Sequence, residues 1–203
     1  MGRMSSFERL RENEREIRKE LIITAAMELF EKKNFWDISM RDIANTAGVS
    51  ASSLYRYFPS RDDLFIEALL QDINHIEVLL KERMGKSEGI EELAIAVVDY
   101  CLDNEPTFQM MCHFLMRGDE NPSVNEKFSS VQLRFLEMFE KVVKSIAGED
   151  AVTEFHIQAF FASLSGIVMT FRHFPGYTDD ERRAYIHKLA LLIMREGGGL
   201  ADR

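Results

Sequence analysis

The side chains best suited to binding chemistry gather in one short window, residues 39–61. The window offers small hydroxyls, aromatic hydroxyls and guanidinium groups. Short polar side chains allow a helix to enter the major groove of DNA, and an arginine can form two hydrogen bonds with guanine O6 and N7. The window therefore predicts a DNA-contacting surface. Its members are Ser39, Arg41, Ser50, Ala51, Ser52, Ser53, Tyr55, Arg56, Tyr57 and Arg61.

Two short helices must position these side chains. Ser39, with Asp42 three residues later, has the form of a capping box that opens the first helix, and Gly48 supplies the left-handed backbone that ends it. Ser50 caps the second helix and Pro59 ends it. The residues expected to form a shared core between the two helices are Ile43, Ala47, Val49, Leu54 and Tyr57. This arrangement predicts a helix-turn-helix, whereas the plainer alternative is a solvated helix-loop-helix.

The same window resembles the signature of the TetR family of bacterial transcriptional repressors. The blocks that stand in the family's order and spacing are Ser39-Met-Arg-Asp-Ile-Ala, Ala47-Gly-Val-Ser50, Leu54-Tyr-Arg-Tyr-Phe58 and Ser60-Arg-Asp-Asp-Leu64. Two positions depart from the pattern, because Ser52 stands where glycine is frequent and Arg61 stands where lysine is frequent. An arginine keeps a phosphate partner but changes its geometry. Outside this window and the helix before it, the chain matches the family only in length and helical character.

The resemblance implies a role for each position. The residues expected to face base edges are Arg41, Ser52, Ser53 and Tyr55. The residues expected to contact phosphates are Ser39, Ser50, Tyr57 and Arg61. The resemblance also implies a homodimer on a double-stranded, palindromic or pseudo-palindromic operator, and repression as the outcome.

Two other classes of protein are alternatives to a DNA-binding regulator. An enzyme would need a catalytic motif, yet the five histidines are scattered over different expected helices without a zinc, dinucleotide, phosphate-loop or serine-nucleophile pattern. Cys101 and Cys112 lack metal-ligand spacing, so we expect free thiols, no metal and no cofactor. The other alternative is a helical small-molecule-binding or adaptor protein without DNA regulation. Such a protein has no use for Arg41 and Arg61 flanking two exposed tyrosines.

The charge of the chain is unevenly distributed. Its 203 residues are 46% apolar and carry a formal charge of −9. Residues 1–61 hold 11 Lys and Arg against 9 Asp and Glu, a net charge of +2, so residues 62–203 carry −11. A small positive module on an acidic body can still bind DNA. We find no signal peptide and no apolar segment of bilayer length, so we expect a cytoplasmic protein with no membrane partner.

Helical periodicity along the chain predicts an all-α fold of about nine helices in two domains. Residues 1–61 are expected to form an N-terminal extension and a three-helix DNA-binding domain, with Trp36 as a core plug. Residues 62–203 are expected to form a larger effector-binding and dimerisation domain, joined by a long helix over 60–84. The residues expected to pack the first helix onto the next two are Ile17, Leu21, Ile22, Ala25, Leu29 and Phe30.

A helix expected from about 150 to 173 has one face of mostly small residues and one bulky face. Small residues permit two helices to approach closely, so we expect the small face to meet its two-fold mate, with the last helix completing a four-helix seam. The alternative is that this face packs within one chain. The residues of the expected interface are Phe155, Ala159, Ala162, Gly166, Tyr185, Leu189 and Leu192.

The middle of the C-terminal part is rich in methionine and aromatic residues. Such residues usually form ordinary core, but methionine is also a good lining for a cavity that accepts an apolar ligand. Proteins similar to the TetR family place effectors among these central helices. We therefore expect a small, mostly apolar effector with one acidic or carbonyl group. The residues expected to bind it are Tyr100, Met111, His113, Leu115, Phe135, Met138, Phe139, Gln158, Phe161 and Ser165.

Overall fold

The protein is described here by a computed structural model that covers residues 6–33, 35–84, 89–117, 122–148 and 153–196. Over these ranges the chain forms nine α-helices and one short 3₁₀ helix, without a strand, so the predicted all-α fold is confirmed. The elements are α1 (Ser6–Lys32), η1 (Phe35–Asp37), α2 (Met40–Thr46), α3 (Ala51–Tyr57), α4 (Arg61–Met84), α5 (Ile90–Asp103), α6 (Glu105–Arg117), α7 (Pro122–Ala147), α8 (Glu154–Phe171) and α9 (Asp179–Glu196). None of the described helices is long and apolar enough to cross a membrane.

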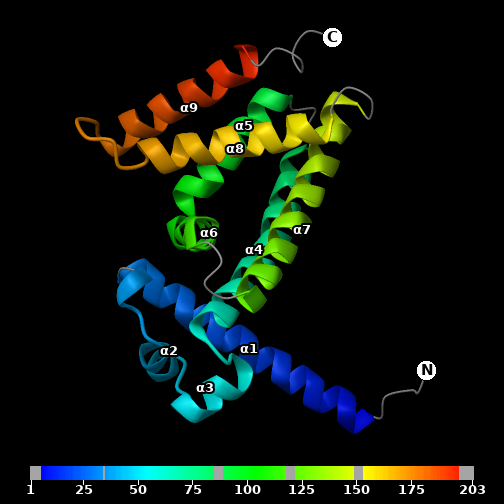
Figure 1. Ribbon diagram of the computed structural model, residues 1–203, viewed down its shortest axis with the longest axis vertical. Coiled ribbons are helices and arrows are strands. Elements are labelled where there is room, and N and C mark those ends of the chain that lie inside the picture. The colour runs from blue at the N-terminus through cyan, green and yellow to red at the C-terminus, as the bar shows by residue number, and fades with distance from the viewer. Residues whose placement is uncertain (1–5, 34, 85–88, 118–121, 149–152, 197–203) are drawn as a thin grey trace.

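The helices form two groups joined by two long helices (Figure 1). Helices α1, α2 and α3 gather at one end, and α5, α8 and α9 at the other. Helices α4 and α7 pack side by side and run from one group toward the other. Helix α6 lies between the groups, where it contacts α1 and η1 as well as α4 and α5. The long helix predicted over 60–84 is therefore present, and α7 runs beside it.

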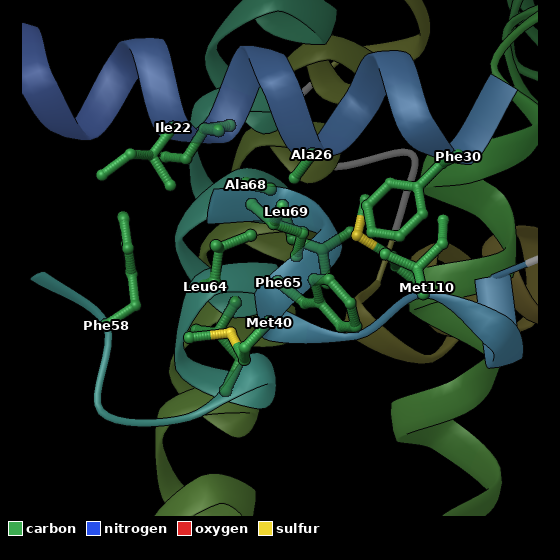
Figure 2. Packing of buried hydrophobic residues seen from close by; sticks show 14 of the residues in the cluster. Ile22, Ala26, Phe30, Met40, Phe58, Leu64, Phe65, Ala68, Leu69 and Met110 are labelled. Carbon is green, nitrogen blue, oxygen red and sulfur yellow. The ribbon is translucent and has the colours of Figure 1, made fainter. Parts of the chain in front are cut away.

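Helix α1 packs through its second half only. Figure 2 shows Ile22, Ala26 and Phe30 facing side chains of α4 such as Leu69. Ile17 and Leu21 were expected in this contact, but both are exposed. The expectation was wrong because apolar contact with the other helices begins at Ile22, while α1 continues beyond the small domain as one uninterrupted helix.

Trp36 is not the core plug expected from the sequence. Its side chain is 59% exposed in η1, and its ring meets the edge of the His113 ring, with centroids 4.9 Å apart. Ile38, two residues later, is fully buried and takes the core position instead. The short 3₁₀ turn therefore places the tryptophan at the boundary between the N-terminal helices and α6.

The apolar core around the short helices continues into the C-terminal part. Met110 and Phe114 from α6 and Val124 and Phe128 from α7 belong to the same buried cluster as the residues of α1 to α4. Figure 2 shows Met110 beside Phe30. Side chains from beyond residue 100 thus help to hold the N-terminal helices in place.

A second buried cluster holds the other end of the molecule together. It is built from α5, α7, α8 and α9, with the Phe139 and Phe160 rings stacked 5.1 Å apart at its centre. Helix α8 begins later than the sequence predicted, because Thr153 is its N-cap residue and Glu154 its first residue. Asp150, the residue at the expected start of this helix, lies outside the described residues.

Candidate nucleic-acid interface and effector cavity

Helix α2 is opened by a complete capping box. The Ser39 backbone N–H donates to Asp42 Oδ2 at 3.0 Å, and the Asp42 N–H donates to Ser39 Oγ at 3.2 Å. The Ser39 hydroxyl also donates to Asp42 Oδ2 at 2.5 Å. This side-chain hydrogen bond first, and the Ser39 backbone N–H second, lower the pKa of the Asp42 carboxyl. Gly48 follows the helix with a φ of +67°, which any other residue would adopt only with strain. The start and stop signals of the first short helix therefore act as predicted.

Helix α3 presents its first turn and one flank to solvent. Ser50 Oγ accepts a hydrogen bond of 3.1 Å from the Ser53 N–H, which confirms the predicted cap. Leu54 is fully buried, and the side chains on the other flank are exposed, including Tyr55 at 51%. The exposed members of the predicted DNA surface are Ser39, Arg41, Ser50, Ala51, Ser52, Tyr55 and Arg56. Arginine, tyrosine and short side chains of α2 and α3 are thus accessible to a binding partner.

Three members of the predicted surface are only partly accessible. Ser53 is half-buried, and Tyr57 packs its ring against the core of the short helices. Arg61 donates from Nη1 to the Ile38 carbonyl at 3.1 Å, and its guanidinium lies over the Phe65 ring. Arg61 therefore ties the start of α4 to the segment before α2. The sequence motif did not reveal this structural contact.

A cavity of about 70 Å³ opens among α4, α5, α6, α7 and α8. Half of the residues predicted to bind the effector lie on its wall: Tyr100, Met111, Leu115, Phe135 and Phe161. Helix α4 supplies Leu69, Asp72, Ile73, Ile76 and Leu79 to the wall, and none of these was predicted. The sequence predicted for this segment only a long helix that joins the two domains. Asp72 lies between the apolar residues Leu69 and Ile73 of this helix. A carboxylate at that position was the sign of a binding site that the sequence analysis missed.

The other predicted effector residues lie elsewhere. Met138 and Phe139 are buried in the second core, and His113 faces Trp36 with Nε2 3.8 Å from Asp62 Oδ1. The remaining two, Gln158 and Ser165, lie on α8 but not on the described wall of the cavity. Gln158 is exposed and donates to Glu154 at 2.8 Å. Phe161 is therefore the one of the three predicted α8 residues on the described wall, although Gln158 and Ser165 lie within one helical turn of it.

Few polar groups interrupt the apolar wall. The Asp72 Oδ2 atom and the Tyr100 hydroxyl are both buried, and neither has a hydrogen-bond partner among the described residues. Burial, together with the nearby Asp72 charge, raises the pKa of the Tyr100 hydroxyl far above its usual range. Burial also raises the pKa of the Cys101 thiol to about 12. Cys101 and Cys112 are free, and the described residues contain no group of three potential metal ligands.

The small face of α8 is open to solvent. Ala159, Ala162 and Gly166 are exposed, and Phe155 is 81% exposed at the start of the same stripe. On α9, Leu192 is 49% exposed, while Tyr185 and Leu189 are half-buried. Within one chain nothing described covers this stripe. The alternative that the face packs intramolecularly is therefore not seen.

Comparison with known proteins gives a family for the short helices. The family model described as bacterial regulatory proteins, tetR family, matches residues 22–68. The HTH-type transcriptional repressor KstR of Rhodococcus jostii is 32% identical over 78 residues, which are 38% of this chain and 37% of that protein. The HTH-type transcriptional regulator RutR of Escherichia coli is 39% identical over 104 residues, which are 50% of this chain and 49% of that protein. The similarity in sequence thus spans half or less of these relatives.

The similarity in fold extends over most of the chain. The structure of FadR from Bacillus subtilis, in complex with stearoyl-CoA, matches with a TM-score of 0.63 at 17% identity, over 86% of this chain and 96% of that one. FadR from Thermus thermophilus, a repressor in complex with lauroyl-CoA, matches with a TM-score of 0.65 at 15% identity, over 91% and 96%. At such identities the likeness shows the fold alone. Residues 22–68 thus belong by sequence to the TetR family of bacterial regulatory proteins, and most of the chain shares the fold of these two solved regulators.

Proposed function

We propose that this protein is a sequence-specific DNA-binding regulator, acting as a repressor, whose operator affinity is modulated by a small effector in the cavity. The observation that carries the proposal is the α2–α3 pair, which is capped at both helix starts and leaves Arg41, Ser52, Tyr55 and Arg56 exposed. These groups suit base edges in a major groove. The matched relatives are transcriptional regulators, so regulation rather than catalysis is the function they support.

In this proposal residues 1–61 bind DNA, and residues 62–203 bind the effector and dimerise. The exposed stripe of Ala159, Ala162 and Gly166 supports a two-fold contact through α8, because small side chains let helix backbones approach closely. A symmetric dimer presents two α3 helices to two half-sites, so the operator would be palindromic or nearly so.

Helix α6 is the proposed link between the cavity and the DNA-binding helices. On one side Met111 and Leu115 line the cavity, and on the other Met110 packs in the core of the short helices. His113 meets Trp36 of η1 and approaches Asp62 at the start of α4. A ligand that moves α6 would therefore change how the short helices are held. By linkage, an effector that weakens operator binding must itself be bound more weakly by the DNA complex.

The FadR neighbours support an apolar effector. Those structures are complexes with stearoyl-CoA and lauroyl-CoA, in which the acyl part is a long apolar chain. The cavity here has a wall made almost entirely of apolar side chains, which suits an apolar ligand of some kind. The chemical nature of its polar group is a separate question.

Selection of DNA fragments by the purified full-length protein tests the proposal. We expect one palindromic sequence to be enriched, and binding to it to weaken in Arg41→Ala and Tyr55→Ala variants. Lys141→Ala removes an exposed positive charge from α7 and serves as the control for net charge. Enrichment of no sequence, or equal binding by all four proteins, would contradict the assignment of α2 and α3 as the reading helices.

A further inference from the structure

The effector cavity contains one acidic group, while the other polar residues of its wall, Tyr100, Asn104, Thr107 and Gln132, are uncharged. Asp72 is the single formally charged residue among the described residues that line it. Its side chain is 17% exposed, and its two oxygens have different surroundings. Oδ1 lies 3.9 Å from Nδ1 of the exposed His75, whereas Oδ2 is fully buried without a hydrogen bond. The carboxylate thus reaches from the outside of α4 to the cavity.

A second oxygen without a hydrogen bond lies nearby. The Tyr100 hydroxyl of α5 is buried on the cavity wall, and the charge and hydrogen bonding of Asp72 both raise its pKa, although no hydrogen bond of normal geometry joins the two groups. The Asp72 carboxylate can only accept a hydrogen bond, whereas the hydroxyl can donate toward Asp72 and still accept a hydrogen bond from a ligand. A buried acceptor without a donor costs free energy, and the cost is larger when the acceptor is charged. A donor brought by a ligand would remove this cost.

The negative charge around the cavity favours a positively charged hydrogen-bond donor on the ligand. A ligand carboxylate would place a second negative charge beside Asp72, whereas a protonated amine would neutralise it and donate up to three hydrogen bonds. The field of residues 62–203, with a net charge of −11, acts in the same direction.

Arg172 does not offset Asp72 inside the cavity. Its guanidinium lies over the Phe108 ring, with Cζ 5.1 Å from the ring centroid, and Nη2 is 3.4 Å from Glu105 Oε1. Phe108 is part of the described cavity wall, and Arg172 is not. The Arg172 Nε and Nη1 atoms are buried without a hydrogen bond, so the Arg172→Met variant below tests whether a ligand carboxylate reaches them.

We propose that the effector is an apolar molecule bearing a protonated amine, which donates to Asp72 Oδ2 and to the Tyr100 hydroxyl while its apolar part lies along Ile73, Met111 and Phe135. This inference rests on the proposed function for the existence of the effector, and it changes the expected chemistry of the polar group from acidic to basic. A carboxylic acid or acyl ligand would be disfavoured in the same cavity.

Three probes that share an octyl chain test the proposal on the full-length protein. Calorimetric titration at pH 7 with octylamine, octan-1-ol and octanoate should rank the amine tightest, by at least about tenfold over octanoate, since a hydrogen bond to a charged group contributes about 1.5–3 kcal/mol. In Asp72→Asn, octylamine affinity should fall at least about tenfold, octan-1-ol should change little, and octanoate should not weaken.

Two further variants separate the cavity from general effects. Glu137→Gln removes an exposed carboxylate from α7 and should leave all three affinities unchanged. Tyr100→Phe should weaken octylamine by less than Asp72→Asn does, and thermal unfolding of each variant checks its fold.

The outcomes distinguish the inference from the proposed function. Octanoate binding as tightly as octylamine, or an unchanged octylamine affinity in Asp72→Asn, would overturn the amine assignment while leaving an effector cavity in place. Octanoate binding that Arg172→Met abolishes would reassign the polar group to Arg172. Binding by none of the three probes would overturn the cavity, and with it the effector part of the proposed function, while operator selection would still test the DNA-binding part.

Discussion

The proposed DNA surface and the effector cavity differ in how far apart in the chain their residues lie. The DNA surface comes from the 23 residues of the window 39–61, and its helices are capped by residues inside that window. The cavity takes residues from five helices between Leu69 and Phe161. The first surface is accessible and polar, whereas the second is enclosed and almost wholly apolar.

This difference shows how one chain can keep a DNA-binding unit while its effector changes. Caps and turns are local devices that depend on few neighbours. A cavity wall depends on the rotation and position of every helix around it, so single substitutions can alter its shape or polarity. Helix α6 joins the two regions, because its residues reach both the cavity and the short helices.

The largest expected effect tests whether the DNA surface binds its operator tightly without the proposed dimer contact through α8. Ala162→Arg places a long charged side chain in the exposed small stripe of α8, so we expect sedimentation to show a monomer at micromolar concentration. Operator affinity should fall by about 100-fold or more, since the second half-site is then no longer bound as an intramolecular event.

The control for this variant adds the same charge elsewhere. Ser129→Arg changes an exposed position on α7 and should remain dimeric with operator affinity near that of the wild type. If Ala162→Arg stays dimeric, the proposed interface through α8 is wrong, and the exposed small residues of α8 do not mark the dimer contact.

The next effect concerns the DNA surface alone. Arg41→Ala should reduce affinity for the selected operator by about 1–3 kcal/mol and relax the preference at one position, because a bidentate arginine discriminates between bases. Competition binding against operators changed one base pair at a time would measure this. A uniform loss over all sequences would instead assign Arg41 to a phosphate, and an unchanged affinity would remove it from the interface.

The DNA-binding unit could be predicted from the sequence because its determinants are local. Ser39, Asp42, Gly48 and Ser50 lie where their capping and turn roles require, and the predicted helices follow. Arg61 is the exception, since its hydrogen bond to Ile38 depends on how α4 packs against the short helices. Long-range packing decided the one role that the motif did not reveal.

The cavity could be predicted only in part, for the same reason. Composition indicated the right helices, and five predicted residues lie on the wall. The rotation of α8 decided that Phe161 faces inward and Gln158 outward, and periodicity alone does not set that rotation to within one residue. Asp72 was overlooked because a carboxylate on a linking helix usually faces solvent.

A third prediction tests the proposed link between the two regions. Trp36→Ala removes the ring that His113 of α6 contacts, at an exposed position where the fold should tolerate the change. We expect near-normal affinity for the operator and for a cavity-binding probe such as octylamine. The probe should weaken operator binding less in this variant than in the wild type, because the contact proposed to transmit the coupling is lost. The total coupling free energy between two such sites is typically about 1–3 kcal/mol.

The coupling is measured by operator titrations with and without the probe. Phe7→Ala removes another exposed aromatic ring, from the first half of α1, and should keep the full probe effect. Equal probe effects in Trp36→Ala and the wild type would show that the signal does not pass through the contact between η1 and α6.

The smallest expected effect concerns the two serine caps, which differ in one respect. Ser39 pairs with the Asp42 carboxylate, whereas Ser50 pairs with Ser53 and has no carboxylate in its box. Each of Ser39→Ala and Ser50→Ala should cost about 1 kcal/mol of unfolding free energy at pH 7, the usual cost of a lost N-cap. Chemical denaturation of both variants and the wild type, over a range of pH, would measure these costs.

The pH dependence of the two costs should differ. The folded pKa of Asp42 lies below its ordinary value of 3.8, so its contribution is complete above that value and is lost as pH falls through the folded pKa. The cost of Ser39→Ala should therefore shrink as the pH falls below about 4, because protonated Asp42 no longer accepts both hydrogen bonds as a carboxylate. The cost of Ser50→Ala should stay constant over the same range, since no group in its cap titrates there. Equal pH dependence of the two variants would mean that Asp42 does not stabilise α2 through its charge, and that the start of this helix is held by contacts from outside the window.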